Sequence, residues 1–403
     1  MRRMAHARRD LSDDGGLAPE IGWSEPGSFG WGVFHERHPR LVRQLREDLP
    51  LGAGQAEALD ALVAETLGGV VAPMGADAVE WEGWGQGRFG RPWREASFLW
   101  AESCFYRRLL EAVGYFGTGA WRGVDPFGPA KEAELQGSVV DEELAALDGL
   151  GDADVDEAQR RDALLAASLW GNRADLGFLM TAGGAGASGD SAGHGLVADD
   201  RAQLWAHLER RRGGLVIVVA DNAGRELLPD LVLVDHLLRG GLAAQVVLHV
   251  KPQPYYVSDA TTDDVVAALR RLRGAGTEAA AQVGRRLWEC AAEGLLVVRA
   301  HPFACAPSAY TGMPEDLAAE FAGAALTVLK GDLNYRRLVQ DRHWPATLPF
   351  AEATAYFPGP VASLRTLKSE VVVGLEPGTV RRMDAAGAPW RTAGTHALVQ
   401  FRS

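Results

Sequence analysis

The chain has 403 residues, of which 47% are hydrophobic and 23% charged, so it can bury one large core or two of ordinary size. Its 41 Lys and Arg residues against 53 Asp and Glu residues give a net charge of −12. This acidity argues against nucleic acid or an anionic membrane surface as a partner, so an anionic ligand would have to bind in a local pocket.

The cysteines and the N-terminal residues indicate the cellular compartment. Cys104, Cys290 and Cys305 form no C-x-x-C pair and no framework typical of secreted proteins, which favours reduced thiols. No run approaches the roughly 18 apolar residues of a membrane span, and residues 1–16 lack the apolar segment of a secretion signal. We therefore expect a cytoplasmic protein with a disordered tail at residues 1–16.

Residues 17–211 are predicted to form a mainly helical cap. Their apolar residues recur at spacings of three and four with charges on the opposite face, as in amphipathic helices. Within this region, residues 181–195 are rich in Gly, Ser and Ala and predict a flexible surface insertion. The expected helices cover residues 39–48, 55–67, 97–113, 141–147, 157–170 and 200–211.

From residue 212 onward, short β-branched runs alternate with helical segments. This alternation predicts a mostly parallel sheet with helices on both faces. The predicted fold is therefore α/β, with a helical N-terminal half packed on a three-layer, Rossmann-like α/β/α half at residues 212–403. The expected strands cover residues 215–220, 244–250, 295–300, 325–329, 370–375 and 397–401, and the expected helices residues 226–238, 263–272 and 314–324.

The end of the first of these strands carries a candidate metal site. Ligands bind at the carboxyl ends of strands in an open α/β sheet, and Asp221 and Asn222 follow the strand directly. Their oxygen atoms suit Mg²⁺ or Mn²⁺. The same pair could instead form a turn and cap the next helix, so both interpretations remain open.

Asp259 follows the second strand, in the loop KPQPYYVSDATTDD just before a helix. Its alternative role is again that of a helix cap. If the two strands are neighbours, Asp259 can face Asp221 and Asn222 across one crevice. Two carboxylates and an amide would fill half of an octahedral site and leave positions for water and a substrate phosphate.

Two later segments combine cations with hydrogen-bonding groups. Residues 330–337 read KGDLNYRR, with a glycine that permits close approach of the backbone and a guanidinium that suits an anion. The alternative is a charged helix start on the surface. Lys368, in the tetrapeptide RTLK, could balance a phosphate dianion.

Six segments in this order resemble one family, the damage-control phosphatases of the ARMT-like class, also described as domain of unknown function 89. The segments are SFLWAESCFYRRL, SLWGNRADL, ADNAGRELLPDLVLVDHLL, KPQPYYVSDATTDD, LKGDLNYRRL and SLRTLKSEVVVGLEPG. The resemblance runs from about residue 20 to the C-terminus. The last segment contains the arginine-threonine-any-lysine signature shared by the sugar-phosphate phosphatases and the acidic residue methyltransferases of this class.

The resemblance implies a phosphatase that needs a divalent ion, Mn²⁺, Ni²⁺, Co²⁺ or Mg²⁺, and hydrolyses small sugar phosphates such as fructose 1-phosphate or fructose 6-phosphate. It assigns metal binding and catalysis to Asp221, Asn222 and Asp259. The spacing of 259 − 221 = 38 residues fits one crossover between parallel strands. The residues to which it assigns substrate binding are Glu226, Asp332, Leu333, Asn334, Tyr335, Arg336 and Lys368.

The residues leave the reaction and the nucleophile open. Water could attack the phosphorus, or the Asp221 carboxylate could attack and form an aspartyl phosphate. The same class implies a second activity, carboxyl methylation with S-adenosylmethionine, for which Gly224 and Asp259 would have to belong to an adenosine pocket. A non-catalytic sugar-phosphate sensor is the third alternative, and the oligomeric state is not indicated.

Two positions depart from the family pattern, and two others have two possible roles. Arg225 stands where relatives are expected to have an aromatic or apolar residue, which bears on substrate preference, and Gly177 stands where Ser is expected. Asn172 and Asp175 could reach the pocket from the helical half or could cap a helix.

Overall fold

The computed structural model describes residues 17–75, 78–85, 87–147, 156–171 and 195–403. The predicted tail, the predicted insertion up to residue 194, and Asn172, Asp175 and Gly177 lie outside these residues. All other predicted site residues lie within them.

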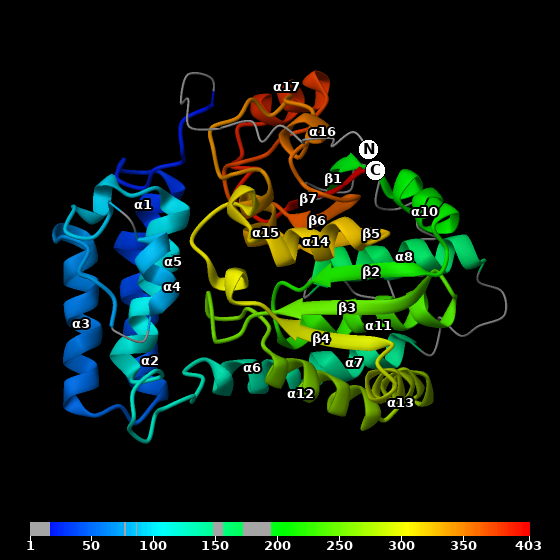
Figure 1. Ribbon diagram of the computed structural model, residues 1–403, viewed down its shortest axis with the longest axis horizontal. Helices are drawn as coiled ribbons and strands as arrows, with labels where there is room; N and C mark the ends of the chain where they lie inside the picture. The colour runs from blue at the N-terminus through cyan, green and yellow to red at the C-terminus, as the bar shows by residue number, and fades with distance from the viewer. Residues whose placement is uncertain (1–16, 76–77, 86, 148–155, 172–194) are drawn as a thin grey trace, which may run out of the picture.

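A seven-stranded sheet forms the centre of the molecule (Figure 1), in the order β1-β7-β6-β5-β2-β3-β4. Neighbouring strands are parallel except for the pair β6 and β7, which confirms the predicted mostly parallel α/β fold. The strands are β1 (Gly195–Asp199), β2 (Gly214–Val219), β3 (Ala243–Val250), β4 (Leu296–Ala300), β5 (Leu326–Lys330), β6 (Val361–Thr366) and β7 (His396–Arg402).

Helices cover both faces of the sheet because alternate strand residues point to opposite sides. In β2, Val216 and Val218 pack into a core with α7, α8 and α10 to α13, whereas Ile217 packs into a second core with α14 to α16. The helices of the first core are α7 (Ser138–Ala146), α8 (Glu157–Trp170), α10 (Arg201–Arg210), α11 (Leu227–Arg239), α12 (Thr262–Arg273) and α13 (Glu278–Ala292). The others are α14 (Glu315–Gly323), α15 (Gly331–Leu338) and α16 (Phe350–Ala353), with α6 (Gly128–Leu135) and α17 (Pro377–Ala385) at the margins.

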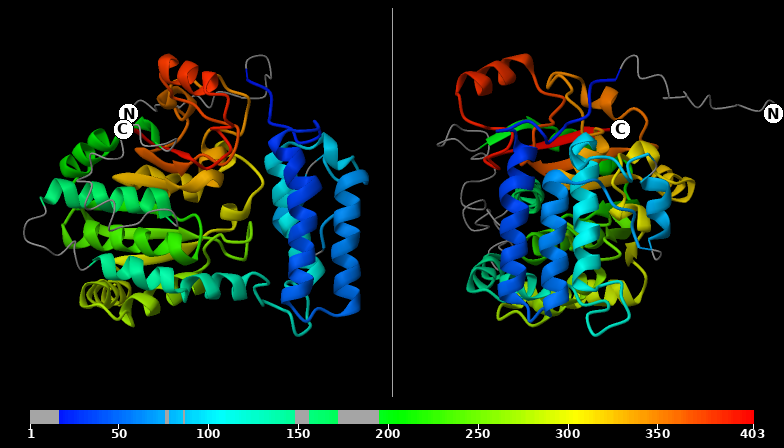
Figure 2. Two further views of the ribbon diagram at one scale, coloured as in Figure 1. Left: turned by 180° about the vertical axis from the view of Figure 1, so that it is seen from behind. Right: turned by 90° about the vertical axis from the view of Figure 1, so that its left-hand side faces the viewer.

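The N-terminal helices form a bundle beside the carboxyl edge of the sheet. Figures 1 and 2 show this bundle opposite the tips of β2, β3 and β4, with α6 running between the two parts. It covers a shorter range than the predicted cap of residues 17–211, because α8, β1 and α10 join the α/β layers. The bundle consists of α1 (Phe29–Gly32), α2 (His38–Asp48), α3 (Ala53–Gly68), α4 (Val79–Trp84) and α5 (Phe98–Val113).

One predicted strand is wrong. Residues 370–375, EVVVGL, form no strand, and the sheet position is taken by β6 (Val361–Thr366), which the sequence did not mark. The carbonyl of Val371 accepts a hydrogen bond from Arg365, and the N–H of Val373 donates to the Tyr335 hydroxyl. Buried side chains therefore satisfy the backbone of this valine run in place of a neighbouring strand.

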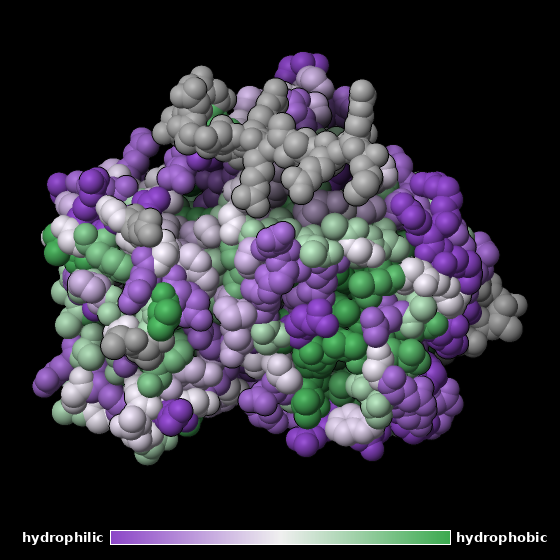
Figure 3. All heavy atoms as spheres, in the orientation of Figure 1, coloured by the Kyte–Doolittle hydropathy of each residue, from purple (hydrophilic) through white to green (hydrophobic). Residues whose placement is uncertain are grey.

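The face seen in Figure 1 carries a continuous hydrophobic area. Figure 3 shows it over β2, β3 and the edge strand β4, and Leu295, just before β4, is 39% exposed. Across the described ranges, none of the helices has the length and apolar character needed to cross a membrane.

Candidate functional site

The structure brings the two predicted metal-binding segments together. Because β2 and β3 are parallel neighbours, the residues that follow them meet at the same edge of the sheet. Asn222 and Asp259 form an isolated antiparallel bridge, and the N–H of Ala260 donates to the carbonyl of Asp221 over 2.9 Å. The backbone segments that carry Asp221, Asn222 and Asp259 therefore lie side by side, and metal binding by these residues stays a prediction.

The Asn222 carboxamide links the two segments through its side chain. Its nitrogen donates to Oδ2 of Asp221 at 3.2 Å and to Oε2 of Glu226 at 2.9 Å. Its oxygen accepts a hydrogen bond of 2.7 Å from the Ser258 hydroxyl, in the residue before Asp259. Asn222 therefore orients groups on both strand ends, which a simple cap of the next helix would not do.

Asp259 is 3% exposed and has lysines on two sides. Lys251 Nζ lies 3.3 Å from Oδ2 of Asp259, yet this oxygen has no hydrogen bond of good geometry within the described residues. Lys131 Nζ donates to the Asp259 carbonyl and to the carboxylates of Asp125 and Asp264, each over 3.0 Å. Burial raises the pKa of Asp259 to about 6, although Lys251 opposes the shift.

Asp221 lies in an excess of negative charge. Its pKa is raised well above the usual value, first by burial and then by the charges of Glu226 and Asp259, while Lys368 and Lys251 act in the opposite direction. A buried oxygen of Asp259 without a hydrogen bond and a carboxyl group crowded by like charges are the conditions that a bound cation would relieve. The donor set fits a hard divalent ion in its chemistry.

The number of protein ligands at this edge is small. The described part of the chain holds no group of three His, Cys, Asp or Glu side chains placed to bind a metal ion. An ion bound by Asp221 and Asp259 would therefore depend on the Asn222 amide and on ligands from outside the chain. This is the arrangement usual for Mg²⁺ with a substrate phosphate.

Asp332 accepts hydrogen bonds from Arg365 and from the backbone of Lys368, the lysine predicted to bind phosphate. Its Oδ1 accepts hydrogen bonds from Nε of Arg365 at 2.7 Å and from the backbone N–H of Lys368 at 3.1 Å. Burial alone would raise the pKa of the Asp332 carboxyl, but the charges of Arg365 and Arg336 and the hydrogen bonds that it accepts together hold the pKa below its usual value. Asp332 thus ties the start of α15 to the end of β6 as a fixed anion.

Asn334 and Tyr335 are almost fully buried and bind protein groups. The Asn334 amide donates to the carbonyl of Ala220 at 3.0 Å, which holds the tip of β2 against α15. The Tyr335 hydroxyl donates to Oε1 of Gln400 at 3.1 Å. Their predicted contact with substrate stays a prediction, and the structure gives both a bonding role inside the fold.

Leu333 packs in the core, and Arg336 is 3% exposed between two carboxylates. Its guanidinium donates to Oε2 of Glu102 on α5 at 2.9 Å and to both oxygens of Asp341 at 3.0 and 2.9 Å. Arg336 therefore joins α15 to the helical bundle. A role in substrate binding stays a prediction for it as well.

Lys368 and Glu226 form a long ion pair at the same edge of the sheet. Lys368 Nζ lies 3.7 Å from Oε1 of Glu226, and the two side chains are 45% and 19% exposed. A lysine that retains this exposure beside buried carboxylates can bind an incoming phosphate. The structure thus brings Asp221, Asn222, Asp259, Glu226 and Lys368 to one edge.

Arg225, which departs from the family pattern, and Gly224, on which the methyltransferase alternative depends, each lie against a glutamate. The Arg225 guanidinium pairs with Glu143 on α7, with Nε at 3.1 Å from Oε1. Gly224 has φ +64, and a Cβ atom there would lie 2.5 Å from Oε2 of Glu134 on α6. The glycine on which the methyltransferase alternative depends is therefore packed against a carboxylate.

Lys131 and Lys251 were not among the predicted site residues. Lys131 is 6% exposed on α6, a helix that the sequence pattern did not indicate, and Lys251 is 3% exposed at the end of β3. Lys251 directly follows the apolar run of its strand, which is the position where functional residues are sought. Lys131 had no comparable signal.

Comparison with known proteins gives a consistent result. Residues 33–383 match the family model described as damage-control phosphatase ARMT1-like domain. The chain is 34% identical to the damage-control phosphatase ARMT1 of Mus musculus over 340 residues, which cover 77% of this chain and 76% of the relative. The identity to the protein of the same name from Homo sapiens is 33%, and to that from Danio rerio 31%, each over 77% of this chain and 75% and 74% of the relative.

A solved structure of a protein of the domain-of-unknown-function-89 family from Pyrococcus horikoshii is also similar. The TM-score is 0.49 at 13% sequence identity, over 93% of this chain and 98% of that chain.

Proposed function

The chain belongs to the damage-control phosphatase ARMT1-like domain family, and we propose that it is a metal-dependent phosphatase that hydrolyses small phosphorylated metabolites. The family supports a phosphatase that acts in metabolite repair. The finer parts of the proposal are the divalent ion, Mn²⁺, Ni²⁺, Co²⁺ or Mg²⁺, and sugar phosphates such as fructose 1-phosphate and fructose 6-phosphate as substrates.

The single observation that carries the proposal is the meeting of Asp221, Asn222 and Asp259 at the ends of two adjacent parallel strands. The three side chains offer oxygen ligands to a metal ion, and burial raises the pKa of both carboxyl groups although Lys251 opposes the shift. A divalent ion bound there would supply charge stabilisation to the transferring phosphoryl group. Phosphoryl transfer needs little else from the protein beyond positioning and charge.

The remaining groups have distinct roles in this proposal. Lys368 binds the phosphate of the substrate through charge-assisted hydrogen bonds, and Asp332 fixes Lys368 by accepting from its backbone N–H. Glu226 holds the Asn222 amide in place and lies beside Lys368. The net acidity of the chain favours small phosphates over polyanions at this site.

The test is release of phosphate from a panel of phosphorylated metabolites by chelator-treated enzyme, with and without added metal. We expect metal-dependent release that disappears in Asp221→Ala and persists in Asp60→Ala, a control in an exposed ion pair with Arg46. Circular dichroism establishes that both variants fold. Release by Asp221→Ala in the presence of EDTA would contradict the metal site, and silence of folded wild type across the panel would contradict the phosphatase.

Single-turnover hydrolysis in heavy-oxygen water tests for one route through Asp221. Label in the released phosphate alone is the result of direct attack by water and equally of an aspartyl phosphate that water opens at phosphorus. Label in the Asp221 carboxylate supports an aspartyl phosphate that water opens at the carbonyl carbon.

A further inference from the structure

The loop between β3 and α12 contains two adjacent residues in the left-handed region of backbone space. Tyr256 has φ 46 and Val257 has φ 70, and neither is glycine. A positive φ is rare for any residue with a side chain and is a strained outlier for a β-branched one. Such a conformation persists only where surrounding contacts hold it.

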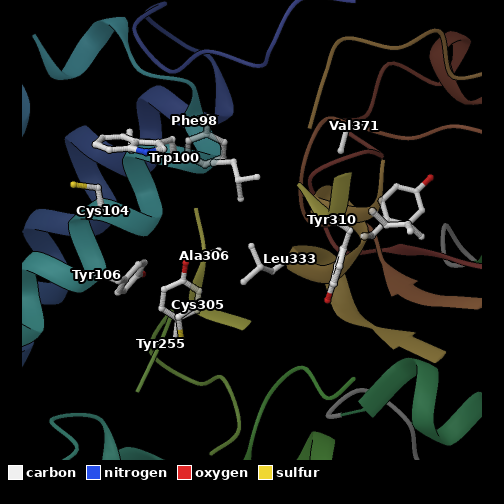
Figure 4. Packing of buried hydrophobic residues seen from close by; sticks show 14 of the residues in the cluster. Phe98, Trp100, Cys104, Tyr106, Tyr255, Cys305, Ala306, Tyr310, Leu333 and Val371 are labelled. Carbon is white, nitrogen blue, oxygen red and sulfur yellow. The ribbon is translucent and has the colours of Figure 1, made fainter. Parts of the chain in front are cut away.

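The contacts that hold this turn come from α5 of the helical bundle. The Ser103 hydroxyl donates to the carbonyl of Leu99 at 2.8 Å, so its oxygen accepts the hydrogen bond of 3.1 Å from the Tyr256 hydroxyl. The ring of Tyr106, one helical turn further along α5, stacks on the Tyr256 ring with centroids 4.8 Å apart. Figure 4 shows Tyr106 beside Tyr255 at this junction between the bundle and the loop.

The strained turn continues directly into the candidate metal site. The N–H of Ser258 donates to the carbonyl of Tyr256 at 2.8 Å, and the carbonyl of Ser258 accepts from the N–H of Ala223 at 2.7 Å. The next residue is Asp259. Tyr256 and Val257 therefore set the path of the backbone into Ser258 and Asp259, next to Asp221 and Asn222.

We propose that Ser103 and Tyr256 are positioning residues, through which helix α5 holds the strained Tyr256–Val257 turn so that Asp259 meets Asp221 and Asn222 in metal-binding geometry. The proposal rests on the metal-dependent function proposed above. It makes the helical bundle a determinant of metal affinity, although none of its residues contributes a predicted ligand.

The test measures metal binding itself, by calorimetric titration of Mn²⁺ into the full chain after removal of metal by a chelator. Loss of one neutral hydrogen bond in Ser103→Ala or Tyr256→Phe should raise the Kd for Mn²⁺ about three- to tenfold. In activity assays, the Mn²⁺ concentration for half-activation should rise by a similar factor, with kcat at saturating Mn²⁺ unchanged. The matched control is Tyr356→Phe, which removes a tyrosine hydroxyl that donates to the carbonyl of Leu338 at 2.6 Å. This control should retain the wild-type Kd.

A second substitution tests the role of strain. Glycine adopts a positive φ without steric cost, so Val257→Gly should relieve the strain that α5 counteracts. In the Val257→Gly background, Ser103→Ala should then change the Kd less than twofold. A general structural role for Ser103 would instead give the same fold-change in both backgrounds.

Each remaining outcome is decisive. Wild-type Mn²⁺ affinity in both Ser103→Ala and Tyr256→Phe would overturn the positioning role while leaving the phosphatase proposal intact. An equal loss of affinity in Tyr356→Phe, or an undiminished effect of Ser103→Ala in the glycine background, would also overturn it. Failure of the wild type to bind Mn²⁺ or any other divalent ion tested would overturn both proposals.

Discussion

Gly331 lies directly against the carboxylate of Asp221. Its φ is +81, and a Cβ atom built on it would overlap with the Asp221 side-chain oxygens. The residue that starts α15, at the end of β5, thus leaves room for the carboxylate at the end of β2. A side chain at position 331 is excluded both by the backbone conformation and by the space that Asp221 occupies.

Gly331→Ala should abolish metal-dependent phosphate release, because the new methyl group displaces Asp221. The positive φ adds a cost in folding stability of about 1 kcal/mol or more. The matched control is Gly387→Ala, where φ is +68 but no atom lies within 4 Å of the added Cβ. This control should lose similar stability from strain and keep its activity. Equal activity in the two variants, measured by phosphate release and urea unfolding, would contradict the contact.

The sheet and the main aspartates could be predicted because they depend on local patterns. Continuous apolar runs mark buried parallel strands, and adjacent parallel strands bring the segments that follow them, which carry Asp221, Asn222 and Asp259, to one edge. The valine run at 370–375 shows the limit of this reasoning. It has the same composition as a strand, and its backbone is satisfied by Arg365 and Tyr335, which no local pattern indicates.

The partners of charged residues could not be predicted for the same reason. Arg336 was assigned to substrate through the family motif, whereas the structure places it between Glu102 of the bundle and Asp341. Lys131 donates a hydrogen bond to the carbonyl of Asp259, and it lies on α6, a helix that has no strong apolar stripe. These contacts join segments far apart in the chain, so they depend on the packed fold and not on any spacing in the sequence.

Arg336→Met should destabilise the fold more than it affects substrate binding. Removing the cation leaves the carboxylates of Glu102 and Asp341 buried without their partner, which costs about 3–5 kcal/mol in comparable buried pairs. Arg88→Met is the control, because the ion pair of Arg88 with Glu20 is 3.8 Å long and partly exposed, and should cost less than about 1 kcal/mol. The midpoint of urea unfolding measures the loss of stability in both variants. A near-native midpoint for Arg336→Met with a tenfold higher KM would instead indicate that Arg336 reaches substrate.

Lys368→Met should show the opposite pattern. Its side chain is 45% exposed beside Glu226, so its loss should change the free energy of unfolding by less than about 1 kcal/mol. A hydrogen bond from a charged group to the phosphate is worth about 1.5–3 kcal/mol, so kcat/KM should fall roughly tenfold to a hundredfold. Lys368→Arg keeps the charge and should retain part of the activity. An unchanged kcat/KM in Lys368→Met would exclude this lysine from the phosphate site.

His38 should make the stability of the helical bundle depend on pH. Its ring is fully buried and stacks on Phe105 at 3.7 Å, and neither ring nitrogen has a hydrogen-bond partner among the residues described. Burial, with a smaller contribution from Arg37, lowers the pKa of His38 well below 6.5. The folded protein therefore keeps the ring neutral at a pH where the unfolded chain protonates it.

The stability that His38 contributes is present above pH 6.5, the pKa of the unfolded state, and is lost as the pH falls below it. Wild type should lose up to about 1.4 kcal/mol per pH unit relative to His38→Phe in this range. Urea unfolding of both proteins between pH 5 and pH 8 measures the difference. His236 and His249, whose pKa values burial also lowers, remain in both proteins and cancel. Parallel stability curves for the two proteins would show that His38 is protonated in the folded bundle as readily as in the unfolded chain.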